Sequence, residues 1–251
     1  MATGSVTVSM QSQALFPFFL MFLAIYLIGY LLLFRRSHPK IRPEFCSCLI
    51  SLVHGTPAAL MSFASLAADD RRGFAAANTP FQKLVLDYSA AYFLTDLLHY
   101  VAFFPGDVLF IAHHLATLFV VLTCRHAVSH GAFSVLVLLL LAETTSACQN
   151  VWTLAGMLRG HRPRAAALYR ALSPPFYALY TLIRGFLGPY FVYRMLHFYA
   201  RGGARGLVPA WAWASWAFVV VLAIGVSIMW ILNLWVQFFR ERRPKLEDKI
   251  R

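Results

Sequence analysis

The sequence predicts an all-α integral membrane protein with about seven transmembrane helices. Of its 251 residues, 60% are hydrophobic and 13% are charged, whereas a soluble domain carries about a quarter charged residues. Apolar runs that approach the roughly 20 residues needed to cross a bilayer recur along the chain. Lys and Arg residues in cytosolic loops, beside anionic lipid headgroups, explain the net charge of +12. Membrane lipids are therefore the expected partners, and nucleic acid is not.

The first apolar run is predicted to stay in the protein as a membrane helix. It is too long for the core of a signal peptide, no basic residue precedes it, and Arg35 and Arg36 follow it. Ser173-Pro174-Pro175 precedes the sixth run, and the chain before this break, from Arg164, is expected to lie in the membrane interface. In chain order the predicted spans are Ala14–Phe34, Phe45–Ala68, Phe81–Phe104, Asp107–Cys124, Gly131–Leu158, Pro175–Tyr199 and Pro209–Phe239.

The loops between these spans divide into two sets by charge. The four segments of one set hold fourteen Lys and Arg residues, and the four of the other set hold five. Because Lys and Arg concentrate on the cytosolic side, the N-terminus is predicted outside the cytosol and the C-terminus inside it. The chain then consists of a non-cytosolic tail (1–13), a multi-span domain (14–239) and a basic cytosolic tail (240–251). The basic set is 35–44, 105–106, 159–174 and 240–251, and the other is 1–13, 69–80, 125–130 and 200–208.

Polar side chains inside the apolar runs are the most informative feature of the sequence. An ionisable group at the bilayer centre costs roughly 2.5–3.5 kcal/mol, so it normally faces the bundle interior and a partner. The third to seventh predicted helices each carry a polar stripe, mostly at spacings of three and four residues. Five consecutive stripes predict a shared polar cavity. They are Tyr92, Asp96 and His99; His113, His114 and Thr117; Glu143, Ser146 and Asn150; Tyr177, Tyr180, Thr181 and Arg184; and Trp230, Asn233 and Gln237.

The adjacent histidines of the fourth span do not share one face, and Asp87 of the third span lies apart from the other polar residues of its helix. The adjacent residues His113 and His114 diverge by about 100° on a helix, so we expect one to face the interior and the other to orient a neighbour. Asp87 precedes Asp96 by nine residues, on roughly the opposite face, and is expected near the membrane interface. The histidines expected to be solvated in loops are His38, His126, His130 and His161.

The polar cluster suits acyl transfer, and its candidate catalytic residues are His113, His114, Asp96 and Glu143. A histidine beside a carboxylate in a dry site is a plausible general base, and an imidazole also accepts an acyl group. Acyl-CoA would then be the co-substrate, and no cofactor is expected. A metal site is disfavoured because too few histidine boxes are present, and a structural hydrogen-bond network is the alternative. The predicted substrate-binding residues are Tyr92, His99, Thr117, Ser146, Asn150, Tyr180, Arg184 and Asn233.

Three motifs in these helices together carry a resemblance to a known family. His113-His114-Leu115-Ala116-Thr117, preceded by Asp107, is similar to the H-H-x-x-T core of the TLC domain, which ceramide synthases share. The run Glu143-Thr144-Thr145-Ser146-Ala147-Cys148-Gln149-Asn150-Val151-Trp152 resembles the E-x-S-T…N-x-R-W stretch of the smaller TLC-domain proteins. Asp96-Leu97-Leu98-His99-Tyr100 resembles the aspartate-bearing segment before the histidine pair. The closest likeness is to small plant TLC-domain proteins of unassigned activity.

The resemblance implies six helices in a barrel around a lipid-sized cavity, residence in the endoplasmic reticulum or another endomembrane, and a part in membrane lipid homeostasis. In ceramide synthases the paired histidines, here His113 and His114, are the catalytic candidates. The H-D-x-x-D stretch of those enzymes has no equivalent here, where Glu143 stands alone, so ceramide synthesis itself is not expected. Three functions stay open: an acyltransferase-like enzyme, a lipid-binding or lipid-sensing regulator of membrane composition, and a lipid transporter or cargo receptor.

Overall fold

The computed structural model describes the backbone of residues 14–250 and the side chains of residues 14–240. Within this range the chain is helical apart from turns, short loops and one isolated bridge between Ala77 and His130, which confirms the predicted all-α fold. The predicted N-terminal tail (1–13) and nearly all side chains of the predicted basic tail (240–251) lie outside the described residues.

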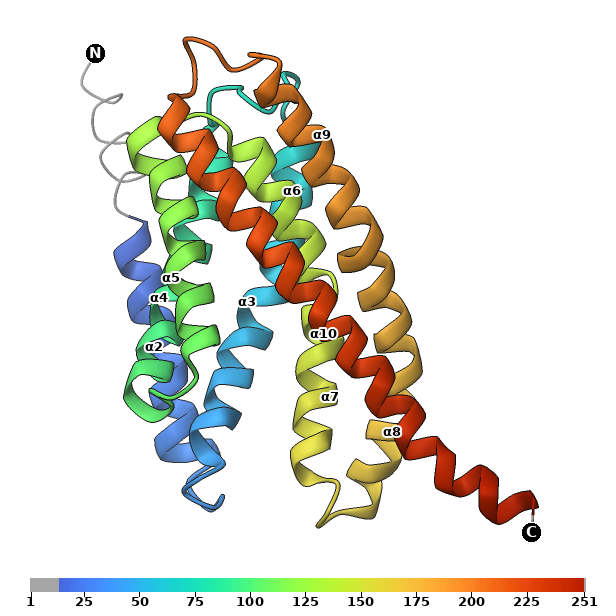
Figure 1. Ribbon diagram of the computed structural model, residues 1–251. Coiled ribbons are helices and arrows are strands. Elements are labelled where there is room, and N and C mark those ends of the chain that lie inside the picture. Colours follow the sequence, from blue (N-terminus) through green and yellow to red (C-terminus); the bar gives the residue numbers. More distant parts are fainter. Residues whose placement is uncertain (1–13, 251) are drawn as a thin grey trace.

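The helices run along one elongated bundle, with connecting turns at its two ends (Figure 1). In chain order the elements are α2 (Leu15–Ile28), η1 (Gly29–Leu33), α3 (Arg42–Ala67), α4 (Pro80–Phe103), α5 (Val108–Leu122), η2 (Thr123–Val128), α6 (Ala132–Glu143), α7 (Ser146–Leu158), α8 (Pro163–Tyr180), η3 (Thr181–Leu187), α9 (Gly188–Ala200) and α10 (Ala210–Ile250), where η1, η2 and η3 are π-helical. Five helical segments in the described chain have the length and apolar composition to cross a membrane: Leu15–Leu33, Arg42–Ala67, Val108–Val128, Ala132–Leu158 and Ala210–Arg240.

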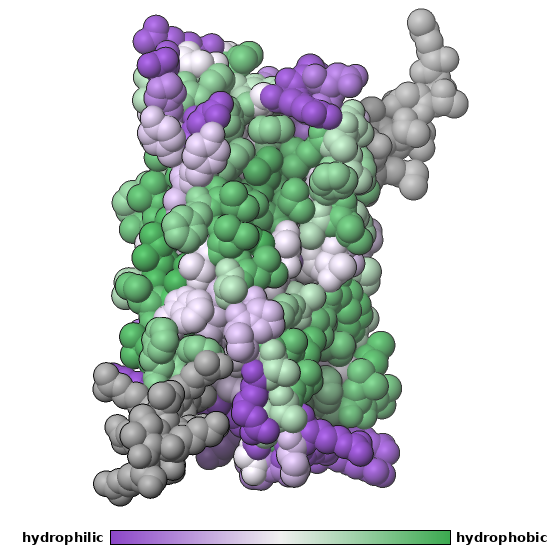
Figure 2. All heavy atoms as spheres, turned by 90° about the vertical axis from the view of Figure 1, so that its right-hand side faces the viewer, coloured by the Kyte–Doolittle hydropathy of each residue, from purple (hydrophilic) through white to green (hydrophobic). Residues whose placement is uncertain are grey.

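The outer surface has the pattern of a multi-pass membrane protein. Figure 2 shows a broad hydrophobic band across the middle of one face, with hydrophilic residues gathered at both ends. The predicted third and sixth spans lie in α4 and in the segment from α8 to α9, which are long but fall outside the five most apolar segments. Both carry charged side chains within the helix, among them Asp96 and Arg184.

The fifth predicted span, Gly131–Leu158, corresponds to the helical segment Ala132–Leu158, within which a turn at Thr144–Thr145 separates α6 from α7. The break expected at Ser173-Pro174-Pro175 was wrong, because α8 starts at Pro163 and runs through both prolines. The Ser173 hydroxyl anchors the helix beside them: it donates to the Tyr169 carbonyl at 2.6 Å and accepts a hydrogen bond from Trp152 Nε1 at 2.9 Å.

The contacts between helices form a closed order around the bundle. From α3 they pass to α4, α5 and α10, then to the continuous segment from α8 to α9, then to α7, and back to α3. In Figure 1, α10 crosses the bundle obliquely from the α5 side to the α8 side. α2 lies against α4 and α3. This is the contact order expected of six helices in a ring, and the barrel itself stays a prediction.

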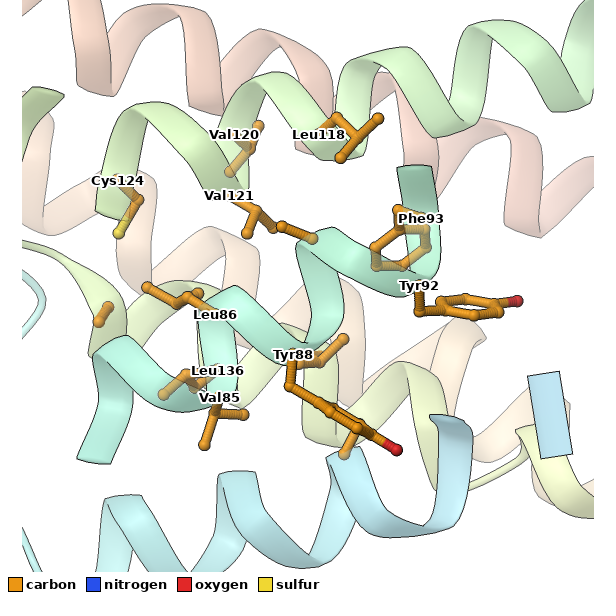
Figure 3. Packing of buried hydrophobic residues seen from close by; sticks show 14 of the residues in the cluster. Val85, Leu86, Tyr88, Tyr92, Phe93, Leu118, Val120, Val121, Cys124 and Leu136 are labelled. Atoms are coloured by element: carbon orange, nitrogen blue, oxygen red, sulfur yellow. The ribbon is translucent and has the colours of Figure 1, made fainter. Parts of the chain in front are cut away.

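α4 is the central helix of the packed core, with buried residues on all its sides. It contacts α2, α3, α5 and α6, which explains why it lacks a single apolar face. Figure 3 shows how its side chains interleave with those of α5 and α6. The labelled core residues are Val85, Leu86, Tyr88, Tyr92 and Phe93 on α4, Leu118, Val120, Val121 and Cys124 on α5 and η2, and Leu136 on α6. Polar groups on α4 are consequently removed from water and need partners within the protein.

Asp87 illustrates this need. The sequence predicts it near the membrane interface, apart from the Asp96 site, and in the structure it is buried, with 1% of its surface exposed. Arg125 Nη2 lies 2.9 Å from Asp87 Oδ2, and His126 Nε2 lies 3.7 Å from Oδ1. His126 itself is 45% exposed, in line with the prediction that it is solvated. The ion pair joins α4 to η2.

We predict that Asp87→Ala destabilises the protein by about 3–5 kcal/mol, because removal of one partner leaves the other charge of a buried ion pair uncompensated. Asp70→Ala is the matched control: Asp70 is exposed, so its loss should change stability by no more than about 0.5 kcal/mol. Unfolding of the purified protein in detergent measures both. Equal stability of the two variants would contradict the structural role of the pair.

Candidate functional site

The buried carboxylate of Asp96 joins three helices by hydrogen bonds. Ser47 on α3 donates its hydroxyl to Oδ1 at 2.7 Å, and Tyr92, one turn earlier on α4, donates to Oδ2 at 3.4 Å. His114 on α5 places Nε2 3.0 Å from Oδ2. Asp96 is 3% exposed and His114 is 4% exposed. Donors from several directions compensate a carboxylate for the loss of its water shell.

Both ring nitrogens of His114 are engaged. Nδ1 lies 2.7 Å from the Phe110 carbonyl oxygen, while Nε2 faces Asp96. A carbonyl oxygen only accepts hydrogen bonds, so Nδ1 carries a proton. The contact at Nε2 then needs a second proton, either on the ring or on the carboxyl group. His114 and Asp96 therefore form a closed, overall neutral pair that has no nitrogen left for a ligand.

His113 instead lines a cavity of about 190 Å³ between α5, α6, the η3–α9 segment and α10. Its ring contacts the rings of Phe93 and His114 with centroid distances of 6.4 and 5.5 Å. Among the described side chains, none forms a hydrogen bond with the His113 ring. The structure thus distinguishes the two adjacent histidines as expected: His114 is buried against Asp96, and His113 faces the cavity.

The cavity is polar at one end and apolar along most of its length. His113 on α5, Glu143 at the end of α6 and Arg184 in η3 lie toward one end, whereas Val121 on α5 and Trp216 on α10 lie toward the other. From His113 to Val121 the helix rises by about 12 Å. Apolar side chains such as Leu138, Val220 and Ile224 form most of the wall between the two ends. An elongated space with one polar end suits a molecule with a polar head and a hydrocarbon chain.

Glu143 owes its position to the break between α6 and α7. The Ala142 carbonyl at this helix end accepts hydrogen bonds from Arg184 Nη2 and from the Thr145 hydroxyl, both at 3.1 Å, in place of a backbone N–H. Gly55 on α3 lies directly against this break. A Cβ atom added at Gly55 would be 2.9 Å from Glu143 Oε2 and 2.7 Å from Ser146 Oγ. Only glycine allows α3 to come this close.

The remaining polar residues of the fifth span connect this break to α3. Asn150 Nδ2 donates to Ser51 Oγ at 2.8 Å and to the Ser146 carbonyl at 2.9 Å. The predicted stripe of Glu143, Ser146 and Asn150 therefore lies on the side of the broken helix that faces α3. These contacts hold α3 and α7 together beside the cavity.

A fully buried histidine that was not predicted from the sequence lies in the same region. His54 on α3 is 0% exposed, and its ring is stacked on that of Tyr92, with centroids 4.0 Å apart and planes 8° apart. Its Nδ1 lies 3.9 Å from Glu143 Oε1. Ser47, Ser51 and His54 are spaced four and three residues apart, which is the same pattern that identified the other stripes. Applied to the second span, that rule would have found His54.

The four predicted catalytic residues do not meet at one point. Asp96 and His114 are in direct contact, while His113 and Glu143 line the same cavity. The Tyr92 and His54 rings lie between the two carboxyl groups: Tyr92 bonds Asp96, and His54 approaches Glu143. The site is therefore one chain of contacts with a closed pair at one end and a cavity at the other.

Several predicted binding residues have other roles. Thr117 lines the cavity, but its hydroxyl donates to the His113 carbonyl at 2.8 Å. His99 lies away from the cavity, with Nδ1 2.8 Å from the Tyr26 hydroxyl on α2. Tyr180 is buried against Trp230, with ring centroids 4.9 Å apart.

Asn233, predicted to bind substrate, is not among the residues that line the cavity. Its side chain is exposed on the outside of α10, as is that of Gln237. The seventh helix turns a different face to the cavity, and Ser227 is one of the residues on that face.

Among the described residues, no group of three or more His, Cys, Asp or Glu side chains is placed to hold a metal ion.

Comparison with known proteins places this architecture in a family. Residues 44–236 match the sequence model of the TLC domain. The chain belongs to the TLC domain family. It is 57% identical over 240 residues to a TLC domain-containing protein of Arabidopsis thaliana, a match that covers 93% of this chain and 94% of that protein. No solved structure matches the chain. The TLC domain includes every residue of the cavity and points to a function connected with membrane lipids.

The different environments of the paired histidines in the TLC domain lead to a test of stability. His114→Ala should cost about 3–5 kcal/mol, because it leaves a buried carboxyl group without its partner. His113→Ala should cost less than about 1 kcal/mol, because its ring faces a cavity and no described side chain bonds it. Unfolding of both variants in the same detergent measures this difference. Equal losses of stability would show that the two rings contribute equally to the fold.

The close approach at Gly55 provides a second test. Gly55→Ala should destabilise the protein by about 1–3 kcal/mol, because the added methyl group overpacks the contact with Glu143 and Ser146. Gly225→Ala, at a helical glycine where an added Cβ meets nothing within 4 Å, is the matched control and should be neutral or stabilising. A Gly55→Ala protein as stable as the control would mean that α3 does not need this approach.

Proposed function

We propose that this TLC-domain protein transfers a fatty acyl group from acyl-CoA to the amine or hydroxyl group of a membrane lipid. The observation that carries the proposal is the His113 imidazole in a mostly apolar cavity that the Glu143 carboxyl group and the Arg184 guanidinium group also line. We place the reaction in the endoplasmic reticulum or another endomembrane, with the N-terminus outside the cytosol. The charge bias of the loops and the TLC domain support this placement.

In this reaction His113 is the general base. As the acceptor nitrogen or oxygen attacks the thioester carbonyl, its proton passes to the His113 imidazole, the carbon–sulfur bond breaks, and His113 returns the proton to the departing thiolate. His114 does not take this role, because both of its ring nitrogens are engaged. The pair it forms with Asp96 fixes α5 and thereby the direction of the His113 side chain. Precise orientation of a base is itself a large part of its effect.

Arg184 supplies positive charge where the reaction develops negative charge. Its Nη2 is held by the Ala142 carbonyl, while its Nε is buried without a partner among the described residues. A cation fixed beside the reacting carbonyl stabilises the oxyanion that forms when the thioester is attacked. The apolar wall beyond it suits the hydrocarbon chain of either substrate.

The test is an assay of the purified protein in nanodiscs with radiolabelled acyl-CoA and a panel of lipids that carry free amine or hydroxyl groups. The wild-type protein should form an acylated lipid, and His113→Ala should lower turnover by about 10²–10⁴-fold, the usual contribution of a general base. His161→Ala is the control, because His161 is exposed in the turn between α7 and α8, and it should match the wild type.

Absence of product with every lipid, or full turnover by His113→Ala, would refute the catalytic proposal. Mass spectrometry of lipid that copurifies with the wild type and with His113→Ala then separates the alternative. A lipid retained equally by both proteins, without turnover, would identify the cavity as a lipid-binding site in a non-catalytic regulator of membrane composition.

A further inference from the structure

His54 is the one fully buried histidine next to the cavity that the proposed reaction does not yet use. Its two ring nitrogens have different surroundings. Nε2 lies 3.2 Å from Ser89 Oγ, whereas Nδ1 has no hydrogen-bond partner among the described residues and lies 3.9 Å from Glu143 Oε1. The flat stack on Tyr92 fixes the plane of the ring, so Nδ1 is held toward Glu143.

The distance between His54 and Glu143 marks an open pair. At 3.9 Å it exceeds the usual 2.7–3.2 Å of a hydrogen bond to nitrogen. A buried polar atom left without a hydrogen bond destabilises the protein, and Glu143 is the acidic group that can relieve this cost. A small turn of the Glu143 side chain would close the gap. Because Glu143 also lines the cavity, its carboxyl group lies between His54 and any ligand.

We propose that His54 is the proton acceptor behind Glu143, and that the pair removes a proton from a lipid amine in the cavity. This inference rests on the proposed function, and it specifies the acceptor as an amine lipid. A primary amine is protonated at neutral pH, as lysine is, and an ammonium group is not a nucleophile. It must lose one proton before it attacks the thioester and a second during the attack, and His113 accounts for only the second.

The transfer takes place in two balanced steps. An N–H bond of the ammonium group breaks as an O–H bond forms on Glu143. That O–H bond then breaks as an N–H bond forms at His54 Nδ1, which leaves a neutral amine in the cavity and a carboxylate–imidazolium pair in the wall. The imidazolium is held on both sides, because Nε2–H donates to the Ser89 hydroxyl.

The other groups around Glu143 favour this direction of transfer. Arg184 on η3 lies at the same end of the cavity, and its charge disfavours a second cation there. Ser146 on α7 and the hydroxyl groups of Tyr88 and Tyr92 on α4 are neutral groups in the surroundings of Glu143. His113 on α5 lines the cavity, and in the proposed reaction it accepts the second proton. Among the described groups, His54 is therefore the base that lies behind the carboxyl group.

Infrared difference spectroscopy of the full chain in phosphatidylcholine nanodiscs tests the pair without any need for turnover. Hexadecylamine is the probe, and hexadecane is its matched control without the amine. In the wild type, hexadecylamine should change the Glu143 carboxyl signal, which is identified by its absence in Glu143→Gln. In His54→Gln, which keeps a polar group toward Ser89 but has none at the position of Nδ1, this change should be lost or its band displaced. His99→Gln removes a buried histidine that bonds Tyr26 instead, and it should respond as the wild type does.

A wild-type spectrum that does not respond to hexadecylamine, or a His54→Gln spectrum that responds identically, would overturn the proposal. If His54→Gln does not fold, histidine ¹⁵N signals in the wild type and in Glu143→Gln give the reciprocal measurement. The His54 signal should then respond to hexadecylamine only in the wild type, and an equal response in both proteins would refute the pair. These readouts are independent of product formation, so a failed acyl-transfer assay and a failed proton pair are distinguishable.

Discussion

The Asp96 carboxylate is the constraint on which the arrangement of this bundle depends. A carboxyl group buried at this depth has no water to solvate it, so the protein must supply its hydrogen bonds. Here they come from Ser47 on α3, Tyr92 on α4 and His114 on α5. Each bond fixes how its helix is turned about its own axis. Because His114 must face Asp96, its neighbour His113 is directed about 100° away, and that direction is the cavity.

A second carboxyl group, Glu143, is placed by backbone geometry rather than by a closed pair. The turn at Thr144–Thr145 ends α6 at Glu143, and Arg184 holds the carbonyl of Ala142 at that end. The absence of a side chain at Gly55 brings α3 to within contact of the break. The Tyr92 and His54 rings then connect the two acidic groups across α4 and α3. One acid is thus rigid and fully bonded, and the other is adjacent to a cavity and able to turn.

Sequence alone was sufficient for the five most apolar spans, because length and apolarity decide whether a segment can cross a bilayer. The stripes on α4 and α5 were also predictable, since a buried acid and a histidine need interior partners. The direction in which a stripe faces was not predictable from the sequence. Asn233 belongs to a regular stripe on α10, but periodicity says which residues share a face, and only packing says where the face points. The turn at Thr144–Thr145 has no glycine or proline to indicate it, whereas Pro174 and Pro175 suggest a boundary although α8 continues through both.

The position of His54 follows from helical periodicity, but its role does not. Its partners, Ser89, Tyr92 and Glu143, lie on two other helices, so no contact within α3 indicates its role. Yet its placement bears directly on which acceptor the proposed reaction can use. The ionisable side chains that line the described cavity are His113, Glu143 and Arg184, and of these Arg184 cannot accept a proton. A hydroxyl acceptor loses one proton during attack, which His113 alone can take. An ammonium acceptor must lose two, so it requires Glu143 as well, and a carboxylate that must return to its charged form requires a base behind it. In the proposed reaction, the choice between an alcohol and an amine therefore depends on a residue that never touches the substrate.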